Sequence, residues 1–114
     1  MNNSHPSTFF GSAQDRGSGQ GLALLLVDIQ RDFWQPLKDA PHLADFPARV
    51  AALLDFARAE RLAVIHTQSV FQPDGSDWML FYTASARGNI PCIAGTDGAR
   101  IEAFAAPRDG ERVI

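Results

Sequence analysis

The hydrophobic pattern of the chain begins with an unbroken apolar run from Leu22 to Val27. Apolar residues without polar alternation are typical of a strand that is buried on both faces of a parallel sheet. Asp28 follows the run directly, and open α/β sheets bind ligands beyond the carboxyl ends of their strands. The pattern therefore predicts a central strand with Asp28 as a candidate site residue. The alternative is that Asp28 only caps the next turn.

A helical pattern follows from about Leu43 to Arg61, after a segment at 35–41 that we expect to be a surface loop. Asp45 is the expected N-cap, and Pro47 stands in the first turn, where its missing N–H costs nothing. Apolar residues recur at helical spacing and define one face: Phe46, Val50, Leu53, Leu54 and Ala57. We therefore predict a one-faced helix that packs on a sheet.

The next apolar segment, Leu62 to Thr67, predicts a second strand. A strand, a helix and a second strand form a right-handed unit with parallel strands, so the end of this strand is expected near Asp28. His66 lies within the strand. We expect a half-buried histidine satisfied by backbone, with a catalytic role as the alternative.

The last third of the chain carries weaker signals. Residues 71–77 contain Pro-Asp-Gly and predict a turn, whereas residues 78–82 crowd large apolar side chains that we expect to pack over a pocket or against a partner. A short helix is expected from Thr96 or Asp97 through Phe104, and a third strand begins near Glu111. The chain finishes on Val-Ile inside that strand, so we expect that it is a fragment.

Composition narrows the class of protein. The chain has 114 residues, 46% of them hydrophobic, which is typical of one soluble domain. Its net charge of −3, with Lys38 as the single lysine, argues against a nucleic-acid partner. No apolar run has the length of a membrane span, and residues 1–20 read as a flexible leader that fits neither a secretory nor a mitochondrial signal. One cysteine excludes an internal disulfide, so we expect a cytoplasmic location.

Several common chemical motifs are missing from the sequence. It contains no glycine-rich nucleotide loop, no paired metal-ligand spacing and no Gly-x-Ser-x-Gly element. Its three histidines lie far apart, so we expect no metal and no cofactor. Cys92 could act as a nucleophile only beside a base and a cation, and we favour the reading of a small buried hydrophobic residue.

Four segments together resemble a known family, the isochorismatase-like cysteine hydrolases, in their order and spacing. They are Ala-Leu-Leu-Leu-Val-Asp-Ile-Gln-Arg-Asp-Phe at 23–33, Val-Ile-His-Thr-Gln at 64–68 with Pro-Asp-Gly-Ser-Asp-Trp at 73–78, Gly-Thr-Asp-Gly-Ala at 95–99, and Pro-Arg-Asp-Gly-Glu-Arg-Val-Ile at 107–114. The first segment is fairly specific, and the later ones gain weight as a series.

The resemblance implies a three-layer α/β fold with a doubly wound, Rossmann-type parallel sheet, of which residues 21–114 would form the N-terminal half. It also implies hydrolysis of small amides or related C–N bonds by an Asp, Lys and Cys triad. Asp28 matches the aspartate, whereas the family's lysine and cysteine fall beyond Ile114. Neither Lys38 nor Cys92 occupies those places. We therefore expect residues 1–114 alone to be inactive.

The resemblance also suggests the rest of the site. In the related nicotinamidases an Asp-x-His pair after the second strand helps to hold a metal, and the matching positions here are Ser69 and Phe71, which favours a metal-free member. The candidate substrate-binding residues are Phe33, Trp34, Gln68, Trp78 and Phe81. The expected partner is a small-molecule substrate, with no membrane contact and with a homo-oligomeric full-length form.

Two other readings remain open. The first is a degenerate, non-catalytic module of the same family that binds a small molecule or a protein partner through residues 78–82. The second is phosphoryl transfer by Asp28 as a nucleophile, but that chemistry usually needs a second aspartate two residues later, where Gln30 stands.

Overall fold

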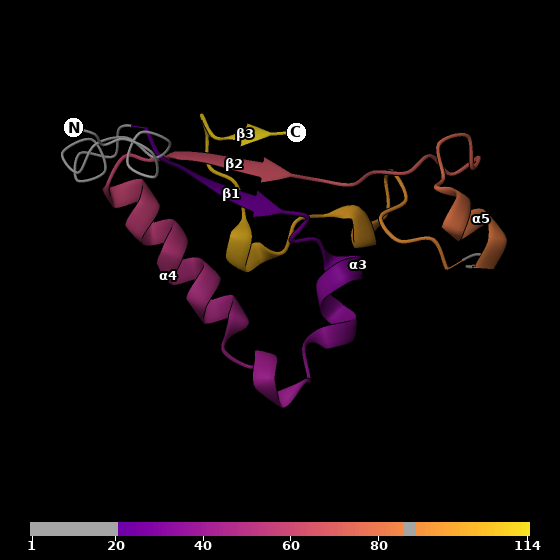
Figure 1. Cartoon of the computed structure of the whole chain (residues 1–114), viewed down its shortest axis with the longest axis horizontal. Helices are drawn as coiled ribbons and strands as arrows, with labels where there is room; N and C mark the ends of the chain where they lie inside the picture. The colour runs from indigo at the N-terminus through magenta and orange to yellow at the C-terminus, as the bar shows by residue number, and fades with distance from the viewer. Residues whose placement is uncertain (1–20, 86–88) are drawn as a thin grey trace, which may run out of the picture.

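The computed structural model of the chain describes residues 21–85 and 89–114, so the leader predicted at 1–20 lies outside the described residues. Strands β1 (Ala23–Val27), β2 (Ala63–Thr67) and β3 (Arg112–Val113) form a parallel sheet in the order β1-β2-β3 (Figure 1). The register pairs Ala23 with Ala63 and Val27 with Thr67, so β1 and β2 end together. The predicted parallel α/β arrangement is confirmed.

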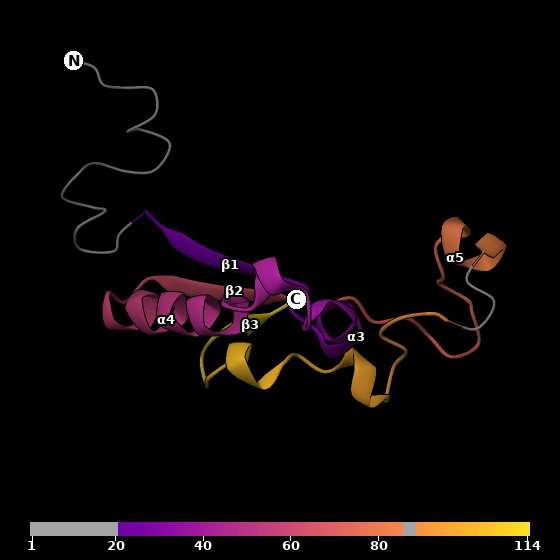
Figure 2. The ribbon, with the colours of Figure 1, turned by 90° about the horizontal axis from the view of Figure 1, so that it is seen from below.

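The two faces of the sheet have different surroundings. The register places Leu24 beside Val64 and Leu26 beside His66 on a covered face. Leu25 and Val27 lie on the opposite face and are 54% and 62% exposed. The prediction that the whole apolar run is buried on both faces is therefore wrong within residues 21–85 and 89–114. The helix and the turns that pack on β1 in this part of the chain all lie on one side of the strand (Figure 2).

Helix α4 (Phe46–Ala59) covers that face. It begins after Asp45 as predicted, but the Asp45 side chain makes no capping hydrogen bond and lies 3.9 Å from Arg49 in an exposed ion pair. Leu53, predicted to face the sheet, is half exposed. The buried core joins the helix to two strands and a later turn through Leu26, Leu54, Ala57, Val64 and Ala105. Each larger member contributes about 1.5 to 3 kcal/mol through burial.

The connection from β1 to α4 is more ordered than the predicted loop. It forms helix α3 (Arg31–Trp34) and 3₁₀ turns at Gln35–Leu37 and Pro41–Leu43. Trp34 is buried and stacks on Phe46 with ring centroids 5.0 Å apart, while Phe104 meets both rings edge-on. Aromatic packing therefore fixes α3 against the start of α4.

The single helix predicted at 96–104 is instead two 3₁₀ turns, Asp97–Ala99 and Ala103–Ala105. The break occurs because Ile101 forms an antiparallel bridge with Gln30, and Glu102 N–H donates to the Ile29 carbonyl at 2.9 Å. Backbone pairing with the segment after β1 thus replaces helical bonds.

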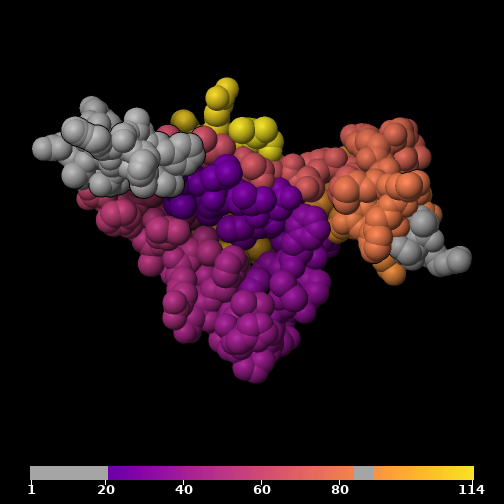
Figure 3. All heavy atoms as spheres, in the orientation of Figure 1, coloured from indigo at the N-terminus to yellow at the C-terminus, as the bar shows by residue number. Residues whose placement is uncertain are grey.

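Helix α5 (Leu80–Ser85) lies at the far end of the molecule, beyond the carboxyl ends of β1 and β2, in both ribbon views (Figures 1 and 2). The space-filling view shows this region as a lobe that projects from the body (Figure 3). We call residues 71–85 the arm. Its apolar residues Met79, Leu80 and Phe81 are largely exposed.

Candidate functional site

The backbone turns sharply at Asp28. Its φ of 54° lies in the left-handed region, which costs a non-glycine residue about 1 to 3 kcal/mol. Two hydrogen bonds hold the turn: Asp28 N–H donates to the Thr67 carbonyl at 3.2 Å, and Gln30 N–H donates to the Asp28 carbonyl at 2.8 Å. The predicted site residue therefore lies at a strained backbone position.

The Asp28 carboxylate points toward the end of β2. The Thr67 hydroxyl donates to Oδ1 at 2.7 Å, and the Ser69 hydroxyl donates to Oδ2 at 2.9 Å. Helix α3 follows without a side-chain cap at its N-cap residue, Gln30. Asp28 is therefore engaged with β2, and these contacts differ from the capping role considered as the alternative.

Gln30 connects the end of β2 to the turn at 97–99 and is completely buried. Its Nε2 donates to the carbonyls of Ser69 and Ala99, both at 2.7 Å, and its Oε1 accepts from Ser69 N–H at 2.9 Å. One side-chain amide thus replaces backbone pairing for three groups in two separate loops.

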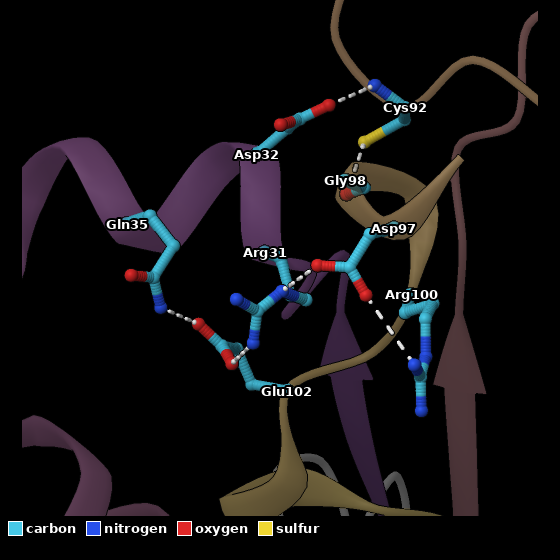
Figure 4. A network of polar contacts seen from close by, with 8 residues as sticks. All are labelled: Arg31, Asp32, Gln35, Cys92, Asp97, Gly98, Arg100 and Glu102. Carbon is cyan, nitrogen blue, oxygen red and sulfur yellow. Dashed lines mark hydrogen bonds and ion pairs between the residues drawn. The ribbon is translucent and has the colours of Figure 1, made fainter.

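Asp32 ties helix α3 to the segment before the 97–99 turn. Its Oδ2 accepts from Cys92 N–H at 2.8 Å, and Cys92 itself has a φ of 57° (Figure 4). The Cys92 thiol is fully buried and points toward the Gly98 carbonyl. Burial, together with the negative charges of Asp32 and Asp28, raises the pKa of Cys92 to about 11. The thiol is therefore protonated at neutral pH, as expected for a packing residue.

Charged groups brace the other side of α3. Arg31 pairs with Asp97 at 2.8 Å and with the buried Glu102 at 3.4 Å, and Gln35 donates to the other oxygen of Glu102 (Figure 4). Glu102 is thereby paired at both carboxylate oxygens, which a buried charge requires. The brace holds the 97–105 turns against α3.

Of the predicted substrate-binding residues, Phe33 and Trp34 share a recess with Asp28. The recess has a volume of about 170 Å³ and an apolar lining completed by Val27, Ile29, Leu37 and Phe46. Gln68 instead lines a larger hollow of about 480 Å³ beside the 94–100 loop, where its Nε2 donates to the Ala99 carbonyl at 3.0 Å.

Trp78 and Phe81 lie on the arm. The Trp78 indole N–H donates to the Gln72 carbonyl at 2.7 Å, and its ring covers Gly75, where a Cβ would lie 3.5 Å from ring atoms. Phe81 contacts Tyr82 edge-on and is 69% exposed. The structure thus places these two residues apart from the recess at Asp28, and their role in substrate binding stays a prediction.

Lys38 and Cys92 have local roles. Lys38 Nζ lies 3.1 Å from Asp39 Oδ2 in an exposed pair of neighbours, and Lys38 does not line the recess. Within residues 21–85 and 89–114, no group of three or more His, Cys, Asp or Glu side chains is arranged to hold a metal ion. The same part of the chain contains no helix that is both apolar enough and long enough to span a bilayer.

His66 is buried more completely than predicted, and its partner is a side chain. Its Nε2 lies 3.0 Å from Glu111 Oε1, and Arg58 donates to both Glu111 oxygens at 2.7 and 2.9 Å. Hydrogen bonds from Arg58 hold the pKa of Glu111 well below its usual range. An ionised carboxylate only accepts, so His66 Nε2 carries the proton. This group secures β3 to β2 and α4.

The sequence analysis did not identify Thr67, Ser69 and Gln30 as partners of the site. Their signal is a polar residue at every second position where a strand ends: Asp28 and Gln30 after β1, and Thr67 at the end of β2 with Ser69 two residues later. Alternate residues share a side of an extended chain, so in a strand this spacing presents two polar groups to a neighbour, whereas after β1 the left-handed turn at Asp28 directs them.

Comparisons with known proteins identify a family and a fold. The family model described as "Isochorismatase domain" matches residues 22–114. The chain is similar to the structure of an isochorismatase family protein from Desulfovibrio vulgaris subsp. vulgaris str. Hildenborough, with 38% sequence identity, a TM-score of 0.65, and coverage of 80% of this chain and 50% of that chain.

A second structure, a cysteine hydrolase from Pseudomonas syringae pv. phaseolicola 1448A, has 22% sequence identity and a TM-score of 0.62 and supports the fold alone. The match covers 80% of this chain and 44% of that chain. None of the curated proteins compared with the chain matches it. The chain thus spans about half the length of the solved structures described here.

Proposed function

Because the chain belongs to the isochorismatase family, we propose that the protein containing it is a cysteine hydrolase in which Asp28 is the proton-transferring carboxylate. The substrate would be a small molecule with an amide or related C–N bond. One observation carries the proposal: the family match includes the strand that Asp28 directly follows, and this carboxylate is held in a strained turn by a hydroxyl on each oxygen.

In this mechanism a thiol attacks the carbonyl carbon of the substrate while Asp28 takes the thiol proton. Asp28 then gives that proton to the leaving nitrogen as the C–N bond breaks, and water releases the acid from the thioester. A lysine ammonium beside the thiol favours the thiolate. Lys38 and Cys92 are engaged elsewhere, so the proposal assigns the lysine and the thiol to residues outside this chain.

The apolar recess beside Asp28 suits the body of a small substrate. Phe33 and Trp34 offer aromatic surface within it, and Asp28 is part of its lining. A volume of about 170 Å³ in this chain fits only a compact group, which favours a small amide over a peptide. Gln68, Trp78 and Phe81 remain proposed contacts for parts of the substrate farther from the reacting bond.

The test is hydrolysis by the full-length gene product. We expect release of ammonia or amine from members of a panel of small primary and secondary amides. Asp28→Asn, which keeps the size of the side chain, should reduce kcat by at least about 10³-fold. Asp39→Asn, at an exposed surface position, is the matched control and should leave kcat unchanged.

A full-length protein that lacks a cysteine nucleophile, or that retains activity in Asp28→Asn, would contradict the proposal. In the first case the non-catalytic reading gains support, with the exposed apolar residues of the arm as the candidate binding surface.

A further inference from the structure

We propose that Gln30 and Ser69 act as a positioning pair for Asp28. Gln30 fixes the backbone of Ser69, and the hydroxyl of Ser69 fixes one oxygen of the carboxylate. This inference rests on the proposed function for its catalytic consequence. The structural part concerns how the carboxylate is held, and it can be measured without any assay of activity.

The first step concerns the orientation of the Gln30 amide. Its NH₂ group has two hydrogens, and both are directed at carbonyl oxygens, those of Ser69 and Ala99. Its oxygen faces Ser69 N–H. A flipped amide would place its oxygen against two carbonyl oxygens and its NH₂ group against an N–H donor. Only one orientation satisfies the buried groups, so Gln30 is a rigid clamp.

The second step concerns Ser69, which lies two residues beyond the end of β2. A loop residue at this point has no ladder partner for both of its backbone groups. Gln30 supplies both, since it accepts from Ser69 N–H at 2.9 Å and donates to Ser69 O at 2.7 Å. The backbone of Ser69 is therefore placed by a buried side chain, and the hydroxyl takes its position from that backbone.

The third step concerns the carboxylate. The Thr67 hydroxyl is near Asp28 N–H at 3.2 Å, from which it accepts, and it donates to Oδ1 at 2.7 Å. This contact alone leaves the carboxylate free to pivot about Oδ1. The Ser69 hydroxyl, at 2.9 Å from Oδ2, removes that freedom. Proton transfer requires a donor–acceptor distance of about 2.6 to 3.2 Å, and a misplacement of about 1 Å can cost about 10²-fold in rate.

The direction of the chain after Asp28 makes the arrangement possible. The left-handed φ at Asp28 and the bond from Gln30 N–H to the Asp28 carbonyl bend the segment back toward β2. Both side chains then reach the same loop residue, Ser69. Asp28 thus supplies the reacting carboxylate, and Gln30, two residues later, holds Ser69, which donates a hydrogen bond to that carboxylate.

The experiment uses the full-length gene product, labelled with ¹³C at the aspartate carboxyl carbons. The resonance of Asp28 is assigned by its absence in Asp28→Asn. At one fixed, near-neutral pH we expect it to move in Ser69→Ala, to return toward its original position in Ser69→Thr, and to stay unchanged in the control Ser76→Ala. Ser76 is an exposed residue of the arm.

Gln30→Met tests the indirect part of the inference. It should move the Asp28 resonance although the Gln30 side chain donates only to Ser69 and Ala99. In a Ser69→Ala background it should move that resonance no further. Additive shifts would overturn the action through Ser69. If Gln30→Met fails to fold, the comparison of Ser69→Ala with Ser69→Thr still decides whether the hydroxyl positions the carboxylate.

Kinetics supply the functional readout. Ser69→Ala should lower kcat about 10- to 100-fold with KM within about twofold, and Ser69→Thr should recover most of kcat. An unmoved Asp28 resonance together with an unchanged kcat would overturn the inference. If the wild-type protein hydrolyses no amide while the resonances behave as expected, the proposed function fails and the positioning role stands.

Discussion

The carboxylate of Asp32 occupies the space that a Cβ atom on Gly98 would need. The same carboxylate accepts from Cys92 N–H, so the absence of a side chain at position 98 allows α3 to approach the loop that carries Cys92 (Figure 4). Gly98 is therefore required by close packing, since its φ is not in the left-handed region.

Gly98→Ala should destabilise the protein by about 1 to 3 kcal/mol, because the added methyl group must displace a carboxylate that is bonded to a backbone N–H. Denaturant unfolding measures this loss. In an Asp32→Ala background the same substitution should cost much less, since the obstructing group is gone. Equal costs in the two backgrounds would contradict the steric explanation.

The hydrogen-bonded group of Arg58, His66 and Glu111 predicts that the stability of the protein depends on pH. Hydrogen bonds from Arg58 depress the pKa of Glu111 in the folded protein, so its stabilising contribution is present above the unfolded value of about 4.3 and is lost as pH falls through the lower folded pKa. Glu111→Gln should lower stability near neutral pH, by about 3 kcal/mol, and should flatten the fall in stability below about pH 4. Unfolding curves between about pH 3 and 7 test both effects.

A suitable control for Glu111→Gln is Asp45→Asn, which removes an exposed carboxylate from an ion pair at 3.9 Å. It should change stability by less than about 0.5 kcal/mol and leave the pH profile unaltered. If the two variants gave the same profile, the Glu111 group would not be the source of the acid sensitivity.

Cys92 should react very slowly with iodoacetamide in the native protein. With a pKa of about 11, about one thiol in 10⁴ is ionised at neutral pH, and the side chain is fully buried. Labelling followed by mass spectrometry of the Cys92 peptide measures the rate, and denaturation in urea should restore rapid reaction. Fast labelling of the native protein at Cys92 would mean that the loop opens readily.

The bare face of β1 predicts poor behaviour of residues 21–114 when they are expressed alone. Leu25 and Val27 expose large apolar surface beside a strand edge that pairs with no strand in the described part of the chain, which favours association. We expect aggregates, which light scattering detects, or partial unfolding, which appears as the loss of a cooperative melt. Leu25→Thr should reduce aggregation of this piece, whereas Val64→Thr, on the buried face, should unfold it further. A soluble monomer with a cooperative melt would contradict this expectation.

Leu25→Thr should be harmful, not helpful, in the full-length gene product if additional chain covers this face of β1. There Leu25→Thr should cost about 2 kcal/mol, because it would remove a buried leucine side chain. A neutral effect in the longer protein would show that the face remains open.

Much of the fold follows from local sequence patterns. The apolar runs before Asp28 and at Leu62 to Thr67, with a helical period between them, predict the parallel pair and the covering helix, because these periods reflect which side chains can be buried together. The position of Asp28 at a strand end likewise follows from one apolar run and one charge. These elements and their order are therefore readable from local pattern, without knowledge of the packing.

The groups that contact the Asp28 carboxylate could be identified only from the packed structure. Thr67 and Ser69 stand 39 and 41 positions from Asp28, and their contacts depend on the register of β1 with β2 and on the left-handed turn. His66 meets Glu111 across 45 positions for the same kind of reason. Local propensity carries no information about such distances along the chain, because a hydrogen bond between separate elements exists only once their packing has fixed both ends.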